Sequence, residues 1–299
     1  MTFITILLPI FFVFGVGYAV QKFFRFDTGV FSKLALYVLV PFLVFRTFYQ
    51  ESINLSYMYI AIYMVGLCLI IILIVTVLSR FRSYSEQERC ALVLSCAFTN
   101  NGNYGTPLIL FLFGTASMDT AIVLMVLQQL LMSTLGVYYA AKGSENADGI
   151  RSALQSVRKM PMVYGAIIGL VFNSFDLPIG RLQDGVTIIA DAAIPLIMLT
   201  LGMQLANIQL GSLDFKKVST ALILKLVLAP MIAALIVWWM PVDPLMKQIM
   251  IIMAATPTAA NTTMYAIQFK TDPQTVTSST LVTTLTSIAT MPVVIYLVS

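Results

Sequence analysis

The stretch TNNGNYGTP, residues 99–107, interrupts an apolar run that extends from about residue 86 to about residue 113. Asparagine, glycine and proline are poor helix formers, and every backbone group released within hydrocarbon is costly unless another group satisfies it. The sequence therefore predicts two half-helices separated by an unwound segment. A second apolar run, at about residues 245–269, contains TPTAANTTMY at residues 256–265, and its proline and polar side chains predict the same interruption.

The two interruptions occupy matching positions of an internal repeat. A shift of 158 residues carries Asn103 onto Asn261. Nearly equal shifts of 154 and 153 residues align two further pairs, Pro41 with Pro195 and Asp119 with Asp272. Each half contains five apolar runs, an odd number, so the second half must enter the membrane from the opposite side. This inverted arrangement is typical of secondary transporters.

Ten apolar runs account for most of the chain, and a transmembrane helix needs roughly 20 such residues. They lie at about residues 3–21, 30–49, 57–79, 86–113, 118–141, 161–175, 183–206, 215–239, 245–269 and 273–298. We predict an all-α membrane protein of ten transmembrane helices in two inverted five-helix repeats, with helices 4 and 9 broken and crossing. Its expected parts are a first repeat at residues 1–141, a cytoplasmic linker at 142–160 and a second repeat at 161–299.

Basic residues predict the orientation of these helices. With the N-terminus outside, 13 basic residues fall in cytoplasmic loops and helix ends and only 3 on the opposite side. The positive-inside rule therefore places both termini outside the cytoplasmic (inner) membrane. No basic residue precedes the first run, which we expect to be a retained helix and not a cleaved signal peptide. The basic linker is expected to lie on the inner leaflet.

The composition excludes several classes of protein. The 299 residues are 59% hydrophobic and 10% charged, whereas about a quarter of a soluble domain is charged, so a soluble enzyme is excluded. The chain has no histidine and no GxxxxGK motif, which argues against a histidine metal site, a Ser/His triad and an ATPase. The basic residues are scattered among apolar runs, so we expect no nucleic-acid partner. The chain offers no plausible pair of nucleophile and base, so we expect no enzymatic activity, and we also expect no cofactor.

Polar residues in the two breaks form the candidate substrate site. Neither break contains an ionised residue, and a half-helix that restarts after a break directs its positive N-terminal end towards the centre. Amide donors and helix ends favour an anion. The candidate binding residues are Thr99, Asn100, Asn101, Asn103, Tyr104, Thr256, Thr258, Asn261, Thr262 and Tyr265, and the residues expected to shape the breaks are Gly102, Gly105, Pro107 and Pro257. The alternative is that all of them only kink and pack two helices.

Charged and amide side chains within the runs are further candidates for charge balance or coupling. Arg46 and Asp191 differ in depth by about 7 Å along their helices, which favours an ion pair; a pair of Asp191 with Lys225 is the alternative. Lys225, at mid-membrane, would supply a fixed positive charge in place of sodium or contact the substrate carboxylate, unless its stem snorkels to the interface. Gln128 and Gln129 are about 100° apart on a helix, so only one is expected to line the site.

These motifs resemble those of the auxin efflux carrier family, which includes plant PIN-type auxin exporters and bacterial permeases for malate, malonate and related acids. The similar elements are Asn100 followed by GNYGTPL, ATPTAANTTMYA followed by KTDPQTV, and IPLIMLTLGMQL from Ile194, and the match extends along essentially the whole chain. The resemblance implies a bile-acid-symporter or NhaA-like fold with a scaffold of helices 1, 2, 6 and 7. It also implies a transport core of helices 3–5 and 8–10, a homodimer through the scaffold, and an elevator-like movement of the core.

The resemblance also assigns roles to single residues. The family's crossover asparagine and proline correspond to Asn100 and Pro107, and its second crossover to Pro257 through Asn261. The charges of the plant exporters in their third helix have no counterpart here, and only about 20 residues replace their regulatory loop. We therefore expect transport of a small organic acid anion by alternating access. The alternatives are an exporter of auxin-like or other monocarboxylates, and an anion-gated channel or sensor.

Overall fold

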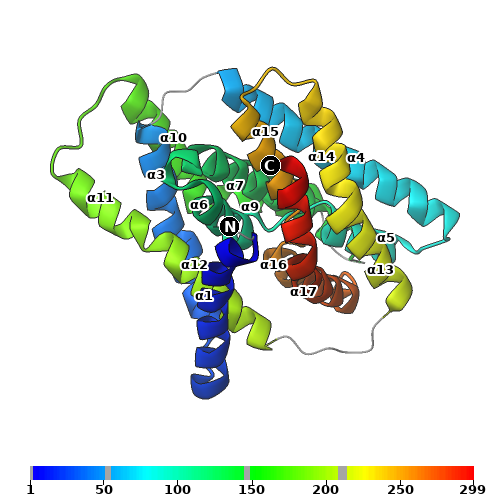
Figure 1. The fold of residues 1–299 in the computed structure, drawn as a ribbon. Coiled ribbons are helices and arrows are strands. Elements are labelled where there is room, and N and C mark those ends of the chain that lie inside the picture. The colour runs from blue at the N-terminus through cyan, green and yellow to red at the C-terminus, as the bar shows by residue number, and fades with distance from the viewer. Residues whose placement is uncertain (1–2, 51–54, 145–148, 208–213) are drawn as a thin grey trace. The chain divides into compact units, whose positions relative to one another are not determined.

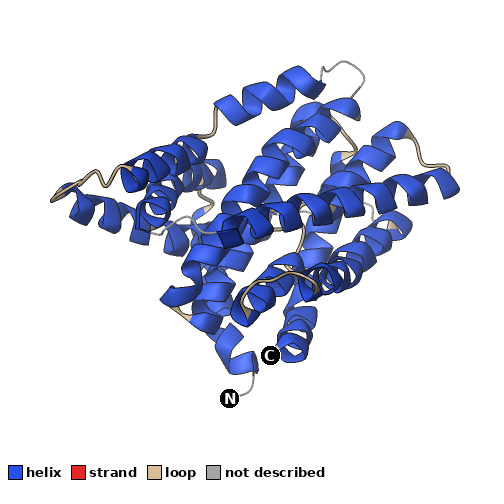
Figure 2. Ribbon diagram, turned by 90° about the horizontal axis from the view of Figure 1, so that it is seen from above, coloured by secondary structure: helices blue, strands red, loops and turns tan. Residues whose placement is uncertain are grey.

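The structure, a computed structural model, describes residues 3–50, 55–144, 149–207 and 214–299, and this part of the chain consists of helices joined by short loops (Figure 1, Figure 2). The elements are α1 Phe3–Phe24, α2 Thr28–Leu34, η1 Ala35–Leu39, α3 Val40–Gln50, α4 Leu55–Phe81, α5 Glu86–Cys96, η2 Asn101–Gly105, α6 Thr106–Phe113, η3 Thr115–Ser117, α7 Met118–Leu131, η4 Met132–Gly136, α8 Val137–Lys142, α9 Gly149–Arg158, α10 Pro161–Ser174, α11 Leu182–Asp191, α12 Ala193–Asn207, α13 Phe215–Ile223, η5 Leu224–Leu228, α14 Ala229–Trp238, α15 Pro244–Ala254, α16 Ala260–Phe269 and α17 Pro273–Val298. The predicted all-α class is confirmed.

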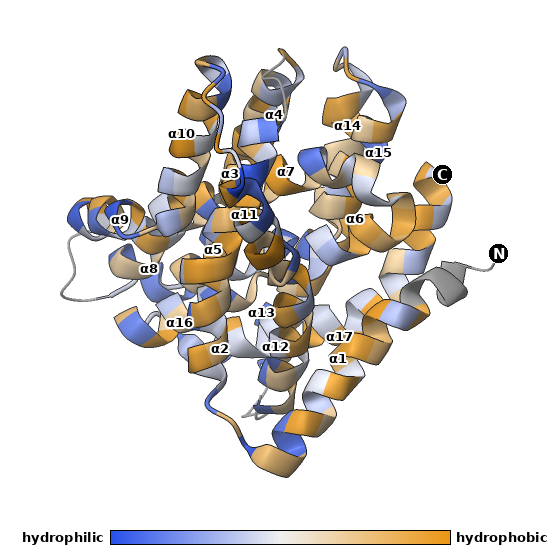
Figure 3. Cartoon of the chain, turned by 90° about the vertical axis from the view of Figure 1, so that its left-hand side faces the viewer, coloured by the Kyte–Doolittle hydropathy of each residue, from blue (hydrophilic) through white to orange (hydrophobic). Residues whose placement is uncertain are grey.

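Many of these helices are suited to a bilayer. Within the described residues, six helical stretches are long and apolar enough to cross it: Thr28–Gln50, Leu55–Phe81, Thr115–Lys142, Leu182–Asn207, Phe215–Trp238 and Pro273–Val298. Shorter apolar helices lie at Leu8–Phe24, Pro161–Ser174 and Pro244–Ala254. Large apolar side chains such as Phe12, Ile188 and Trp238 are exposed. Apolar residues, coloured orange, occur along most of the helices (Figure 3). The chain is therefore a multi-pass membrane protein, while the number of ten crossings and their sidedness stay predictions.

The helices form two compact units, each assembled from separate parts of the sequence. The first unit comprises Met1–Tyr57, Gly102–Val126 and Lys159–Ile208. The second comprises Met58–Asn101, Leu127–Arg158 and Gln209–Ser299. The proposed repeats, the linker at residues 142–160 and the division into scaffold and core stay predictions.

Two closely packed helix pairs build the first unit, α1 with α12 and α3 with α10. Glycine allows each close approach, because a Cβ atom at Gly17 would overlap the carbonyl oxygen of Leu199. In the other pair, a Cβ atom at Gly169 would lie 2.7 Å from the carbonyl oxygen of Phe45. Helices within a membrane are not driven together by the hydrophobic effect. Small residues at their interfaces allow tight backbone packing, which stabilises the contact instead.

An ion pair joins α3 to α11 in the same unit. Nη1 of Arg46 lies 2.6 Å from Oδ1 of Asp191, so the pairing favoured by the depth of these residues is present. The two side chains are 22% and 64% exposed, respectively.

Asp191→Asn is expected to lower the free energy of unfolding by about 1 kcal/mol, because it leaves the Arg46 guanidinium without its carboxylate. Thermal unfolding in detergent micelles measures the loss, and the charge-swapped pair Arg46→Asp with Asp191→Arg should recover part of it. Asp184→Asn is the matched control, since Asp184 lies on the same helix and has no ion pair among the described residues. Equal losses in the two single variants would contradict the role of the pair.

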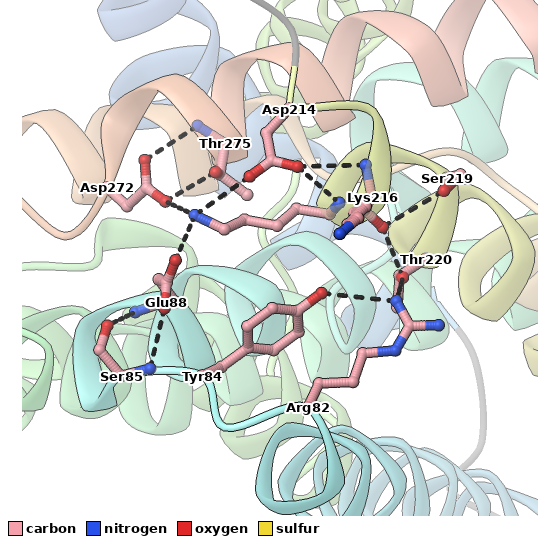
Figure 4. A network of polar contacts seen from close by, with 11 residues as sticks. Arg82, Tyr84, Ser85, Glu88, Asp214, Lys216, Ser219, Thr220, Asp272 and Thr275 are labelled. Atoms are coloured by element: carbon pink, nitrogen blue, oxygen red, sulfur yellow. Dashed lines mark hydrogen bonds and ion pairs between the residues drawn. The ribbon is translucent and has the colours of Figure 1, made fainter.

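In the second unit, one lysine connects the beginnings of three helices (Figure 4). Nζ of Lys217 lies 2.7 Å from Glu88, 3.2 Å from Asp272 and 3.5 Å from Asp214. Each carboxylate also belongs to a helix N-terminus: Asp214 caps α13, Asp272 caps α17, and Glu88 completes a capping box with Ser85 at α5. These carboxylates interact favourably with the helix dipoles, and the ammonium removes their mutual repulsion.

Lys217→Met is expected to destabilise the protein by about 2–3 kcal/mol, because it leaves three close carboxylates without a counter-charge. The side chain of Lys217 is 12% exposed, whereas those of Glu88, Asp214 and Asp272 are 32%, 46% and 21% exposed, so water screens part of the carboxylate repulsion. The neighbouring Lys216 is exposed and has no ion pair in the described part of the chain, which makes Lys216→Met the control. Thermal unfolding of both variants measures the difference, and a Lys216→Met loss as large as that of Lys217→Met would refute it.

Candidate functional site

The first predicted break lies after α5, which ends at Cys96. Residues 97–100 are not helical, and the chain then resumes as the π-helical turn η2 and the helix α6. The break is thus shorter than the predicted residues 99–107. Gly105 has helical dihedral angles, and a Cβ atom at Gly102 would make an ordinary contact with Met125, so neither glycine is needed to unwind the chain. Pro107 lies inside the continuous helical stretch formed by η2 and α6, where it has no N–H to donate to a preceding carbonyl group.

The second predicted break lies after α15, which ends at Ala254. Residues 255–259 are not helical and include Pro257, and α16 begins at Ala260. This break is also shorter than predicted. Asn261, Thr262 and Tyr265 belong to α16 and not to the unwound segment.

The two unwound segments cross and pair with each other inside the second unit. The amide N–H of Asn100 donates to the carbonyl oxygen of Pro257 at 2.9 Å, and that of Ala259 donates to Phe98 at 3.0 Å. Thr99 and Thr258 lie opposite each other in this short antiparallel bridge. Each break therefore satisfies backbone groups that the other leaves open, which a break within hydrocarbon requires.

Threonine hydroxyls satisfy the helix ends at the crossing. Thr258 Oγ1 donates to the carbonyl oxygen of Ser95 at 2.6 Å, near the end of α5. Thr256 Oγ1 donates to Met253 at 2.8 Å near the end of α15, and Thr262 Oγ1 donates to Ala259 at 2.7 Å. The hydroxyl protons of these three candidate binding residues are thus engaged with the backbone, which gives them a structural role.

Two buried amide groups at the crossing have no partner. The Nδ2 atom of Asn100 and the Nε2 atom of Gln128 are buried without a hydrogen-bond acceptor among the described residues. The residues are 5% and 4% exposed, and Oε1 of Gln128 already accepts from Thr99 Oγ1 at 2.9 Å. A buried donor without an acceptor costs about 1–3 kcal/mol, so each of these donors points to an absent ligand or water.

A small cavity adjoins the crossing within the second unit. It is lined by Tyr63, Met64, Leu67, Cys68, Ala97, Thr99, Asn101, Gln128 and Ala254. The centre of a water molecule has about 10 Å³ of space there, which is enough for roughly one water. In this conformation the cavity is too small for a dicarboxylate. Gln128 is among the lining residues and Gln129 is not, while the expectation that only one of them lines the substrate site stays a prediction.

The N-terminus of α16 adds positive potential at the end of the second break. Its N-cap residue, Ala259, has no side chain that could accept a hydrogen bond from the first turn. Asn261, the second residue of the helix, is half-buried. The amide N–H of Thr262 donates to the carbonyl oxygen of Ala259 at 3.2 Å, and the positive end of the helix dipole at this terminus favours an anion.

Two of the predicted binding residues belong to the first unit. The ring of Tyr104 is buried and packs against Phe14 with ring centroids 6.0 Å apart. Asn103 is half-buried in η2. Their contact with a substrate, like that of the half-buried Tyr265 in the second unit, stays a prediction.

The lysine predicted to lie at mid-membrane, Lys225, is fully enclosed in the second unit. Lys225 lies in the π-helical turn η5, is 1% exposed and donates from Nζ to the carbonyl oxygen of Ala254 at 3.4 Å. The side chain therefore does not extend to the surface, contrary to the snorkelling alternative.

Sequence reasoning missed two residues that support the crossing. Tyr63 lines the cavity and donates to the carbonyl oxygen of Met250 at 2.8 Å. Thr283 Oγ1 accepts from the amide N–H of Thr258 at 3.2 Å. The run TSSTLVTTLTS at residues 277–287 was the available signal for Thr283, because so many hydroxyls in one helix must bond to a backbone inside the membrane. Nothing in the apolar sequence around Tyr63 marks it.

Comparison with known proteins gives matches along nearly the whole chain. A family model described as membrane transport protein matches residues 2–295. The chain is 24% identical over 275 residues to an uncharacterized transporter of Methanothermobacter thermautotrophicus, across 89% of this chain and 87% of the relative. It is 21% identical over 263 residues to an uncharacterized transporter of Methanocaldococcus jannaschii, across 85% of this chain and 84% of the relative.

Proposed function

The chain belongs to the membrane transport protein family, the auxin efflux carrier-like family that its motifs resemble, and on this premise we propose that it carries a small organic acid anion across the cytoplasmic membrane. The substrate class is a malate-like or malonate-like carboxylate. The mechanism is alternating access with an elevator-like movement of the core, in a homodimer formed through the scaffold helices.

The observation that carries this proposal is the pair of buried amide donors, Asn100 Nδ2 and Gln128 Nε2, that have no acceptor in the part of the chain that the structure describes. A carboxylate only accepts hydrogen bonds, so it can satisfy such donors, whereas a cation cannot. Hydrogen bonds to a charged acceptor are about twice as strong as neutral ones, which offsets the cost of burying the anion. The uncapped start of α16 favours the same charge.

Repetition within the first unit supports the inverted-repeat architecture on which alternating access depends. The shift of 154 residues that aligns Pro41 with Pro195 also aligns Phe45 with Leu199. The carbonyl group of each of these two residues is approached closely by a glycine, Gly169 and Gly17. The packing of α3 with α10 thus corresponds to that of α12 with α1, as two inverted copies of one helix pair would require.

The small size of the cavity supports a carrier that changes conformation. A cavity with room for about one water cannot admit a dicarboxylate, so substrate entry requires movement of the surrounding helices. A channel, by contrast, needs a continuous open path.

Uptake into proteoliposomes tests the function. Labelled malate, malonate and an aromatic monocarboxylate are supplied with and without pH and sodium gradients. Saturable uptake of malate or malonate, with counterflow exchange, is the expected result. Transport of only the aromatic acid supports the monocarboxylate exporter, and conductance that does not saturate at millimolar substrate supports the channel. No transport of any carboxylate, by protein that is folded and inserted, refutes the proposal.

A further inference from the structure

The carbonyl oxygen that Lys225 contacts terminates a broken helix. Ala254 is the last residue of α15, and the residue four positions later, Thr258, donates its amide N–H to Thr283 instead. The Ala254 carbonyl therefore lacks the partner that a continuous helix would give it. The Lys225 ammonium, 3.4 Å away, takes that place.

The end of the other broken helix lies in the same region. The cavity is lined both by Ala254 and by Ala97, the residue that follows α5. The π-helical turn η5, which carries Lys225, also contacts α5. A helix C-terminus carries roughly half a negative charge, so two such ends together amount to about one charge that a single ammonium balances.

Other groups at these ends supply hydrogen bonds but no charge. Thr258 and Thr256 donate hydroxyl protons to Ser95 and Met253. Among the described residues no carboxylate forms an ion pair with Lys225. The end of α15 then supplies the negative partial charge that the Lys225 ammonium contacts.

We propose that the Lys225 ammonium is the resident cation of the crossover, held between the C-terminal ends of α5 and α15 where a sodium-dependent carrier would bind its ion. Half-helix C-termini and unwound carbonyls are the groups that coordinate coupling cations in carriers with broken helices. With the lysine present, a sodium ion has no vacant place, so transport is independent of sodium. Lys225 is a positioning residue, and the inference rests on the proposed transport function.

The repeat is consistent with one resident cation and not two. A shift of 157 residues, within the range that aligns the two halves, carries Cys68 onto Lys225. Both residues lie beside the crossing, Cys68 in the wall of the cavity and Lys225 against Ala254. A small neutral thiol at one repeat position leaves room for the long cationic side chain at the other.

Chemical rescue of Lys225→Ala tests the inference. The substitution removes the equivalent of propylammonium, and we expect carboxylate uptake into proteoliposomes to fall at least about tenfold, the factor for losing one charge-assisted hydrogen bond. Added propylammonium or sodium should restore uptake several-fold, whereas 1-propanol, a neutral molecule of the same size, should not. Lys225→Arg should retain most of the activity, and Lys216→Ala, at an exposed lysine, should behave as wild type.

Wild-type protein provides a test that does not depend on the folding of a variant. Its uptake should be the same in sodium and in choline buffers, and a requirement for sodium would overturn the inference. Full uptake by Lys225→Ala in choline buffer, or equal rescue by 1-propanol, would also overturn it. If wild type transports no carboxylate, the transport proposal fails, and thermal unfolding still tests the cation site: propylammonium should stabilise Lys225→Ala and leave wild type unchanged.

Discussion

Gly17→Leu is expected to prevent the first unit from folding, because there is no space for a side chain between α1 and α12. Even a Cβ atom at Gly17 would overlap the backbone carbonyl of Leu199, and backbone cannot move aside as a flexible side chain can. Inserting extra groups into packed interiors costs about 1–3 kcal/mol when side chains can adjust. Here two helices must separate along their contact, so we expect a loss above about 4 kcal/mol, in the range of the most damaging single substitutions. The yield of monodisperse protein and its thermal unfolding measure the effect.

Gly15→Leu is the matched control for this substitution. Gly15 lies on the same helix, only two residues away, and a Cβ atom there would have no neighbour within 4 Å. Leucine is a better helix former than glycine by nearly 1 kcal/mol, so this variant should be as stable as wild type or slightly more stable. The sign of the effect should therefore reverse between two neighbouring glycines. Similar unfolding temperatures for both variants would show that α1 and α12 are not in close contact.

The positions of the helix breaks could be predicted from the sequence, but their lengths could not. Polar and helix-breaking residues in the middle of an apolar run are costly in a bilayer, and this cost locates the interruptions. The same residues are individually tolerated in a helix when tertiary contacts favour it. Gly102 and Gly105 thus both lie in the π-helical turn η2, and Asn261 lies in the first turn of α16. Propensity is a weak prior that packing overrides.

The charged contacts show which long-range pairs a sequence can reveal. The pair of Arg46 with Asp191 follows from depth, because two ionised groups within a membrane have few possible partners. The cluster around Lys217 was not predicted, since its partners Glu88 and Asp272 are 184 residues apart and lie at helix ends, where depth is not restrictive. Only the capping pattern S-x-x-E at residues 85–88 was visible locally.

For the candidate site too, the composition of the breaks predicts a polar centre, whereas the roles of its single residues depend on tertiary contacts. Amides and threonines together suggested a polar centre, yet the hydroxyls of Thr256 and Thr258 donate to the backbone. The amides of Asn100 and Gln128 keep unused donors. Which polar group is left unpaired depends on the crossing of two segments about 158 residues apart, and no local pattern reports it.

The double variant Asn100→Ala with Gln128→Ala is expected to raise the Kd for a transported carboxylate by about two to four orders of magnitude. Each hydrogen bond to a charged acceptor contributes about 1.5–3 kcal/mol, so two contribute about 3–6 kcal/mol. Saturation of uptake in proteoliposomes and ligand-dependent thermal shifts measure the change. Gln129→Ala is the control, because Gln129 is adjacent on α7 but does not line the cavity, and its affinity should equal that of wild type.

The stability of the double variant without ligand separates a binding role from a structural one. Residues that only hold the crossing together would destabilise the protein when truncated. Unpartnered donors, by contrast, each cost the empty protein about 1–3 kcal/mol, so their removal should leave the unfolding temperature unchanged or raise it, after allowance for the lost bond from Thr99 to Gln128. Gln128→Glu sharpens the comparison, because it keeps the acceptor for Thr99 and replaces the free donor with an oxygen that repels a carboxylate. Normal carboxylate affinity in Gln128→Glu would exclude this amide from the substrate site.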